Sequence, residues 1–473
     1  MSLGLRLQIR MPDETGRKRK LERPSGHPIG TRPTRTVFFL LLLIPILSTV
    51  AYGGTAMWAL MLVAPMIMIL GTVWLVRSWR MSEFLVSSDP IWYPIAGLLL
   101  FALFQLLPLG GTNLSGELLS ISASNSLSLD PYSTRIFIVR LLGYLIFFLA
   151  ALTFIDSEKR LRKLAAATAI FGGVAAFAGI IQWLASPDAI YGVRPTPQAI
   201  PFGPYVNRHH FASLMVLFSG IALSQVLGRS ASKEKKLLFA ISLVLMAIST
   251  VLTGSRGGVL AYIAMFAVCS LTAFRKTNSG TATVYRFPLV AGSVAFVVFI
   301  VGLVVFLGGA DPLLRGLGLQ NETNDITSGR LHFWSVAWQI FTSNPIFGAG
   351  MEAFGVAYTK FDTRNGFFRT EQAHNDYLQM LADGGIVGFG IAVSFLVMFV
   401  KRGINAITNA SSEFVLDTRI GAFAGCLGIL IHSFFDFPLR TASNAFFFLL
   451  VLAMMLVQVS NKQDGETLTG REP

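Results

Sequence analysis

The chain has 473 residues, of which 53% are hydrophobic and only 13% charged. This composition excludes an ordinary soluble domain and is typical of a protein that crosses a membrane many times. A formal net charge of +13 would fit a nucleic-acid-binding protein. The basic residues, however, are distributed over separate loops between apolar runs, so we expect no nucleic acid as a partner.

Residues 1–35 are polar and basic and are expected to form a disordered cytoplasmic tail. Apolar runs that are long enough to cross about 30 Å of hydrocarbon as helix follow this tail. They predict an all-α, polytopic membrane protein with about twelve transmembrane helices. The predicted spans are 36–52, 55–76, 91–108, 136–154, 164–184, 211–228, 237–253, 258–274, 287–308, 384–400, 420–437 and 441–458.

These spans divide the chain into five parts. Residues 36–308 would hold the first nine transmembrane helices, and 384–458 the last three. Between them, residues 309–383 form a long polar loop in which short helices are expected, and 459–473 form a second tail. The two cysteines, Cys269 and Cys426, both fall inside apolar runs, so they do not indicate a disulfide framework.

The distribution of charge predicts which loops face outward. Most of the 38 Lys and Arg residues lie on alternate loops, which the positive-inside rule places in the cytoplasm together with both termini. Arginines that remain on outer loops near helix ends indicate an anionic partner, because the planar guanidinium matches phosphate. They are Arg135, Arg140, Arg194, Arg208, Arg256, Arg315, Arg330, Arg364, Arg369 and Arg440.

Two outer segments present an arginine at the start of a helix. The stretch 254–258, GSRGG, predicts a very short turn with Arg256 at its tip. Arg330 opens an amphipathic stretch that ends near Asn344 and is expected to lie on the membrane surface. The alternative for both is structural: an arginine that extends to the membrane interface beside a helix contact or an interfacial anchor.

The segment 371–378, EQAHNDYL, carries the candidate base. Histidine is a frequent general base, so His374 can accept a proton from a hydroxyl. The spacing predicts that His374 and Tyr377 share one face of a short helix ending at Gly384 and Gly385. The structural alternative is a helix start that is capped by Asn375 or Asp376.

Two further clusters lie at the outer ends of predicted spans. Asn207, Arg208, His209 and His210 open the sixth span, and His432 and Asp436 have helical spacing near the end of the eleventh. Neither an HExxH motif nor a Cys/His ligand pattern is present, so we expect no metal. The chain also lacks a phosphate-binding loop and a dinucleotide fingerprint, so we expect no cofactor.

In this order the outer segments resemble the O-antigen ligase and O-antigen polymerase family of bacterial inner membranes. The resemblance covers roughly residues 90–440 and is most specific in 250–440, where GSRGG, SGRLHFW, NPIFGAG and QAHNDYLQMLADGGIVG follow one another. It implies a GT-C-like helical membrane fold. It also implies a metal-independent, inverting glycosyltransferase that uses a glycan linked to undecaprenyl diphosphate. The acceptor would be lipid A core or a growing polysaccharide, and the active site would face the periplasm.

The resemblance also implies roles for individual residues. The family's essential arginine pair falls on Arg256 and Arg330, and its candidate base on His374. The sequence around His209 and His210 departs from the family's more typical Asn-His, which leaves the roles of these two histidines open. Further residues are expected to bind substrate: Asn207, Arg208, His209, Arg369, Asn375, His432 and Asp436.

Two other classes of protein fit less well. Transferases that use a monophosphate sugar donor and a metal resemble one another in carrying acidic residues in the first outer loop. In this sequence that loop is about residues 51–55, which contain no acidic residue. A transporter of lipid-linked oligosaccharides would show polar groups near the bilayer midplane, often in repeated halves. Ligase and polymerase use the same donor and base, so the motifs leave that choice open, with a slight preference for ligase.

Overall fold

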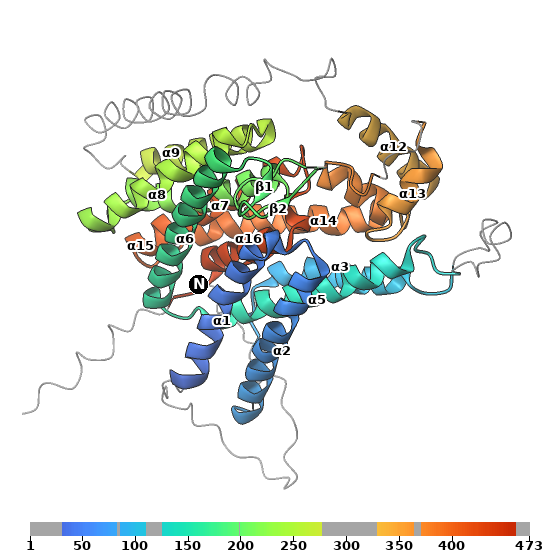
Figure 1. Cartoon of the computed structure of the whole chain (residues 1–473). Coiled ribbons are helices and arrows are strands. Elements are labelled where there is room, and N and C mark those ends of the chain that lie inside the picture. The colour runs from blue at the N-terminus through green and yellow to red at the C-terminus, as the bar shows by residue number, and fades with distance from the viewer. Residues whose placement is uncertain are drawn as a thin grey trace, which may run out of the picture.

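The computed structural model describes residues 31–82, 86–109, 125–197, 199–276, 329–363 and 370–459. Within these ranges the chain is a bundle of helices with connecting turns (Figure 1). The helices are α1 (Thr31–Val50), α2 (Met57–Arg80), α3 (Tyr93–Gln105), α5 (Pro131–Phe154), α6 (Glu158–Ala185), α7 (Arg208–Leu227), α8 (Lys233–Leu252), α9 (Arg256–Lys276), α12 (Arg330–Ser343), α13 (Phe354–Phe361), α14 (Asp376–Thr408), α15 (Glu413–His432) and α16 (Ala442–Leu456).

The short elements add little to this bundle. Three 3-10 turns are η1 (Tyr52–Gly54), η2 (Pro90–Trp92) and η3 (Pro438–Arg440). A two-residue antiparallel pair, β1 (Ala189–Ile190) with β2 (Arg194–Pro195), departs from the all-α prediction.

The helices agree with the predicted membrane spans. Seven of the helices in the described ranges are long and apolar enough to cross a membrane, namely α2, α5, α6, α7, α8, α14 and α15, and shorter apolar helices lie in α1, α3, α9 and α16. Each predicted span within the described ranges coincides with one of these helices. The predicted span 287–308 lies outside the described residues, so the total of about twelve stays a prediction. The chain is therefore a helical membrane protein.

Helix α7 lies at the centre of the bundle, packed against α6, α8, α9 and α15 (Figure 1). Small residues allow it to approach α15 closely: a Cβ added at Gly220 would lie 2.5 Å from the carbonyl oxygen of Gly421. Such glycine contacts are a common way of packing helices in membranes. The contact fixes the start of α7 relative to the end of α15, and both of these ends carry predicted site residues.

The described part of the long loop has a small apolar core of its own. Helices α12 and α13 pack on each other and on α14, with Val336, Ile340, Phe354 and Tyr358 buried between them (Figure 1). The start of α12, which carries Arg330, lies beside the segment before α14, because the ring of Phe333 stacks on that of His374. The loop is thus attached to the bundle through a packed apolar surface.

Helix α14 is interrupted at Gly385, which has a left-handed backbone (φ 60°). The turn that follows α12 accepts the displaced hydrogen bonds, because Ile386 N donates to Pro345 O at 2.9 Å and Val387 N donates to Ile346 O at 3.2 Å. The sequence predicts a short helix that ends at Gly384 and Gly385 and a membrane span that begins at 384, and the interruption at Gly385 agrees with both. The second part of α14 follows directly after the break, because the turn satisfies its backbone.

Candidate active site

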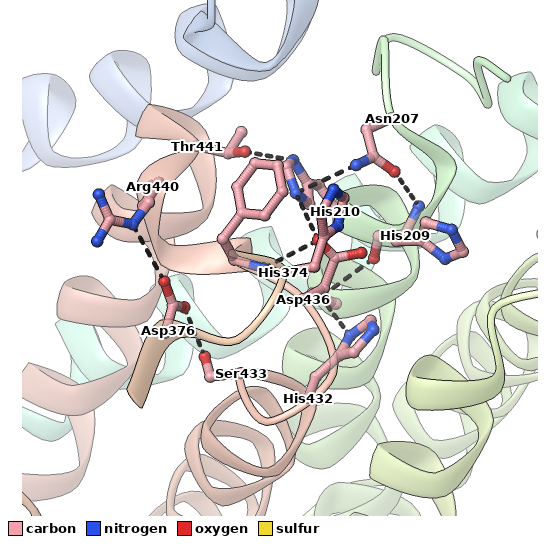
Figure 2. Close-up of polar contacts among 12 residues, drawn as sticks. Asn207, His209, His210, His374, Asp376, His432, Ser433, Asp436, Arg440 and Thr441 are labelled. Carbon is pink, nitrogen blue, oxygen red and sulfur yellow. Dashed lines mark hydrogen bonds and ion pairs between the residues drawn. The ribbon is translucent and has the colours of Figure 1, made fainter. Parts of the chain in front are cut away.

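A buried carboxylate, Asp436, lies at the centre of the site in the turn between α15 and η3 (Figure 2). Its side chain is fully buried. Its Oδ1 is 3.3 Å from Nδ1 of His374 and 3.6 Å from Nε2 of His210. Its Oδ2 is 3.9 Å from Nη2 of Arg330. One carboxylate therefore faces two imidazoles and one guanidinium.

These neighbours keep Asp436 ionised. Burial alone would raise the pKa of this carboxyl group, because it removes the charged form from water. The imidazoles of His210, His374 and His209 outweigh that effect, and the pKa lies well below its usual range. The site thus contains a permanent negative charge next to the candidate base.

His374 lies just before α14 and has a left-handed backbone (φ 52°). The prediction that it shares a helix face with Tyr377 was therefore wrong. Its Nδ1 is buried and faces Asp436, so the 29% of the side chain that is exposed belongs to other atoms of the ring. The ring packs against Phe333 and Phe437, with centroids 5.7 and 4.9 Å away. An imidazole whose Nδ1 faces a carboxylate can act as a base through Nε2.

Asn375 serves the helix start. Its Oδ1 accepts hydrogen bonds from Tyr377 N at 3.0 Å and Leu378 N at 3.1 Å, which makes it the N-cap of α14. The structural alternative for this residue is confirmed, and its role in binding substrate stays a prediction.

The start of α7 brings His210 to the centre of the site. Asn207 caps this helix by accepting a hydrogen bond from His209 N at 2.8 Å. His210 is buried, and its Nδ1 is 2.6 Å from Oγ1 of Thr441 while its Nε2 faces Asp436 (Figure 2). His209 is only partly buried. Of the two histidines whose roles the sequence left open, His210 is the one that contacts Asp436.

His432 joins three elements at the same place. It ends α15, its Nδ1 is hydrogen-bonded to Ser213 Oγ of α7, and its Nε2 is 3.4 Å from Ser255 Oγ in the turn before α9. A Cβ added at Gly257 would lie 2.7 Å from the ring. The residues on both sides of Arg256 therefore touch His432, which brings the GSRGG turn next to the Asp436 segment.

The structure does not support direct contact with substrate for every residue predicted to bind it. Both Asp436 and His432 are buried, and the protein itself contacts the nitrogens of the histidine, so their geometry favours positioning of other residues. Arg208 is the first residue of α7, and its backbone N donates to Ile200 O. Arg369 lies outside the described residues.

A buried ion cluster beside the site was not predicted from the sequence. The side chain of Arg440 is 12% exposed and pairs with Glu352 at 3.1 Å, Asp376 at 3.3 Å and Asp383 at 3.4 Å. Burial would lower the pKa of Arg440, but the three carboxylates outweigh this and raise it. The sequence marks Arg440 only as an outer arginine, because no local spacing connects it to its partners.

The described residues contain no group of three or more His, Cys, Asp or Glu side chains that could hold a metal ion. The polar centre lies where α7, α9 and α14 begin and where α15 ends. Fold and site together define a helical membrane protein with a candidate base and arginines gathered at one end of its bundle.

Comparison with known families finds a match over part of the chain. Residues 241–393 match the family model described as O-antigen ligase, which confirms the resemblance seen in the motifs. The matched segment includes Arg256, Arg330 and His374, whereas Asp436 and Arg440 lie beyond it. No curated protein matches the chain.

Proposed function

We propose that the protein is a glycosyltransferase that moves a glycan from undecaprenyl diphosphate to an acceptor sugar at the periplasmic face of a bacterial inner membrane. The reaction would be of the O-antigen ligase type, inverting and metal-independent, in the synthesis of lipopolysaccharide or another surface polysaccharide. The pairing of His374 with Asp436, next to Arg330, is the observation that carries this proposal. The O-antigen ligase match supports it.

The geometry supports a base-assisted transfer. Asp436 holds His374 through Nδ1, so Nε2 would take the proton from the acceptor hydroxyl. The acceptor oxygen then forms a bond to the anomeric carbon as the bond from that carbon to the diphosphate oxygen breaks. The bonding electrons leave with undecaprenyl diphosphate. Attack from the face opposite the leaving group inverts the configuration.

The arginines would stabilise the negative charge that builds up on the departing diphosphate. One nitrogen of Arg330, Nη2, lies 3.9 Å from Asp436. A guanidinium has five N–H donors in a planar fork, so other donors of Arg330 are not used by this contact. The arginine is therefore already held at the site with donors to offer a phosphate group. The GSRGG turn, which touches His432, would supply Arg256 to the same group.

The location of the polar groups favours a transferase over a transporter. A transporter would place its polar residues near the middle of broken membrane helices. Here the described site residues lie at helix ends: His210 in the first turn of α7, His432 at the end of α15, and His374 before α14. Ligase and polymerase differ in the acceptor, lipid A core in the first case and another carrier-linked repeat unit in the second.

The test of the proposal is His374→Ala in a reconstituted assay with an undecaprenyl-diphosphate-linked glycan. A general base contributes about 10²–10⁴ in rate, so transfer should fall by about that factor. The chain offers a matched control in His332, whose Nε2 lies 2.9 Å from Oδ1 of Asp362 in a second His–Asp pair. His332→Ala should retain most of the activity. Near-normal transfer by a correctly inserted His374→Ala protein would refute the assignment of the base.

A further inference from the structure

A cavity of about 260 Å³ lies between α3, α5, α14 and α16, next to the candidate active site. Much of its wall is apolar and comes from the membrane helices: Leu98, Phe137, Leu141, Phe395, Leu396 and Phe448. At one end it is lined by Glu352, Asp376 and Arg440, which belong to the buried ion cluster. The cavity is thus apolar along most of its wall and charged at one end.

Two donors on the wall of this cavity have no partner among the described residues. Both Nε of Arg140 and the hydroxyl of Tyr144 are buried and make no hydrogen bond there. They lie four residues apart on α5, so they face the same side of the helix, and both line the cavity. Other polar groups of the wall have partners: Ser433 donates to Asp376, the hydroxyl of Tyr377 donates to Leu430 O, and Arg440 pairs with Glu352.

The position of Arg140 supports a ligand here. It lies four residues after the start of the predicted span 136–154, about 6 Å along the helix axis. A guanidinium inside a membrane span is costly and normally has an anionic or carbonyl partner. Arg135, on the same helix, is exposed and needs no such partner.

We propose that this cavity binds a phosphate-bearing lipid, with a hydrocarbon chain along its apolar wall and phosphate oxygens at Arg140 and Tyr144. Guanidinium and phenol donors match phosphate oxygens, and the apolar wall matches a chain. Glu352, Asp376 and Asp383 lie around Arg440 at the charged end. This negative charge favours a lipid with a single phosphate group over a diphosphate.

The lipid site is therefore distinct from the proposed diphosphate site at Arg256 and Arg330. The two sites are connected through the polypeptide backbone. Asp376 lines the cavity and lies two residues after His374, and Ser433 lines it and lies three residues before Asp436. A second lipid at this place would be the anchor of the acceptor. That role rests on the proposed function, whereas binding of the lipid does not.

Photolabelling of the full chain in maltoside micelles tests the site. The probe is a phosphatidic acid with a diazirine in one acyl chain, and labelled peptides are identified by mass spectrometry. Label should concentrate on the α5 and α14 peptides that line the cavity. Arg140→Gln and Tyr144→Phe should each reduce it about tenfold, because each removes a donor to phosphate. The matched control is Arg135→Gln, which makes the same charge change on an exposed part of α5 and should leave labelling unchanged.

A second pair of variants tests the part of the cavity that would hold the hydrocarbon chain of the lipid. Ala392 lines the cavity, and Ala392→Trp should block labelling by filling it. Val139, which is 70% exposed on α5, provides the control Val139→Trp, which should not affect labelling. Retention of label in Arg140→Gln, Tyr144→Phe and Ala392→Trp would overturn the proposal.

Competing lipids identify the occupant. Phosphatidylglycerol or undecaprenyl monophosphate should displace the probe, and whichever competes better shows whether the natural chain is acyl or isoprenoid. Diacylglycerol competing equally well would show that phosphate is not recognised, and stronger competition by undecaprenyl diphosphate would assign the cavity to the donor. Either result would overturn the proposal. Labelling without any glycan transfer by the wild-type protein would instead refute the proposed function alone.

Discussion

One carboxylate serves three basic side chains at the candidate site, since Asp436 lies within 4 Å of His210, Arg330 and His374. If a buried ion pair loses one partner, the remaining charge is left without compensation in a medium of low dielectric constant. Asp436 is therefore expected to affect both folding and catalysis. These two effects can be separated by a substitution that removes the charge and keeps the shape.

Asp436→Asn is that substitution. Loss of an orienting carboxylate behind a catalytic imidazole reduces rates by up to about 10⁴, so we expect transfer to fall by about 10² or more with little change in KM. A loss confined to KM would assign Asp436 to substrate binding instead. The readout is steady-state transfer with the carrier-linked donor.

The stability of the same variant should show a defined pH dependence. The pKa of Asp436 in the folded protein is depressed, so its stabilising effect is fully present above its unfolded pKa and is lost only as pH falls through the lower folded value. Thermal unfolding in detergent should therefore show a difference between wild type and Asp436→Asn that is present above the ordinary pKa of an aspartate, about 4, and that shrinks below it. A difference already lost as the pH falls to neutral would mean that this carboxylate titrates there.

Arg256 and Arg330 should act on one diphosphate. Two negative charges need more than one cation, and a bidentate fork matches phosphate where an ammonium does not. A double-mutant cycle of Arg256→Ala and Arg330→Ala should therefore show strongly non-additive losses of transfer, and lysine at either position should be a poor substitute. Strictly additive losses, or full activity with lysine, would separate the two residues.

The sequence could single out His374, Arg256 and Arg330 as candidates, because each lies in a short motif that resembles one of the family. It could not identify the contacts of His210 or Arg440. His210 and Asp436 are 226 positions apart in the chain, and Arg440 pairs with three carboxylates that are distant from it in the sequence. No local spacing of residues in the sequence indicates these contacts. Contacts of this kind depend on how helices pack, which hydropathy does not encode.

At the scale of elements, Arg440 connects the segment after α15 to both the start of α14 and the turn after α12. The first two of these segments carry Asp436 and His374, and the third follows α12, the helix that begins at Arg330. The ion cluster thus holds together the parts of the site that come from different elements. Its effect on catalysis would be exerted through the position of other residues.

Arg440→Gln should therefore lower kcat as well as stability, because it releases the segments and leaves buried carboxylates without a counterion. Arg440→Lys keeps the positive charge but lacks the planar guanidinium that pairs with three carboxylates, so we expect an intermediate loss of kcat and stability. The matched control is Arg402→Gln near the other end of α14, where Arg402 pairs with Asp89 at 2.6 Å. The two variants are compared under conditions in which both have lost the same thermal stability. If the kcat of Arg440→Gln is then no lower than that of Arg402→Gln, the role of Arg440 is purely structural.

Sequence periodicity locates the helices and the break at Gly385, but not the contacts that support this break. Apolar runs predict the helices because a membrane span needs a long apolar stretch to satisfy its backbone internally. The sequence predicts a helix end at Gly384 and Gly385 and a new span from 384, and the structure agrees. It does not show that Pro345 and Ile346 supply the missing acceptors, because these contacts depend on how α12 and α14 pack.

For the whole molecule, the charge asymmetry of the loops predicts that the site faces outward. Cysteine labelling tests this, and the background should be low because Cys269 and Cys426 are both buried. Val193, which is 76% exposed between β1 and β2, lies on a predicted outer loop, and Lys235 lies on a predicted inner one. Val193→Cys should react with an impermeant reagent in intact spheroplasts, and Lys235→Cys only after lysis. The opposite pattern would place the candidate site in the cytoplasm.

The left-handed backbone at His374 has a consequence for how far the protein can be stabilised. A side chain in this conformation costs about 1–2 kcal/mol, which glycine avoids. The rest of the fold must bear that cost in order to present an imidazole at this point in space. Glycine at position 374 would remove this cost and stabilise the backbone, but it would also remove the imidazole that the proposed chemistry needs.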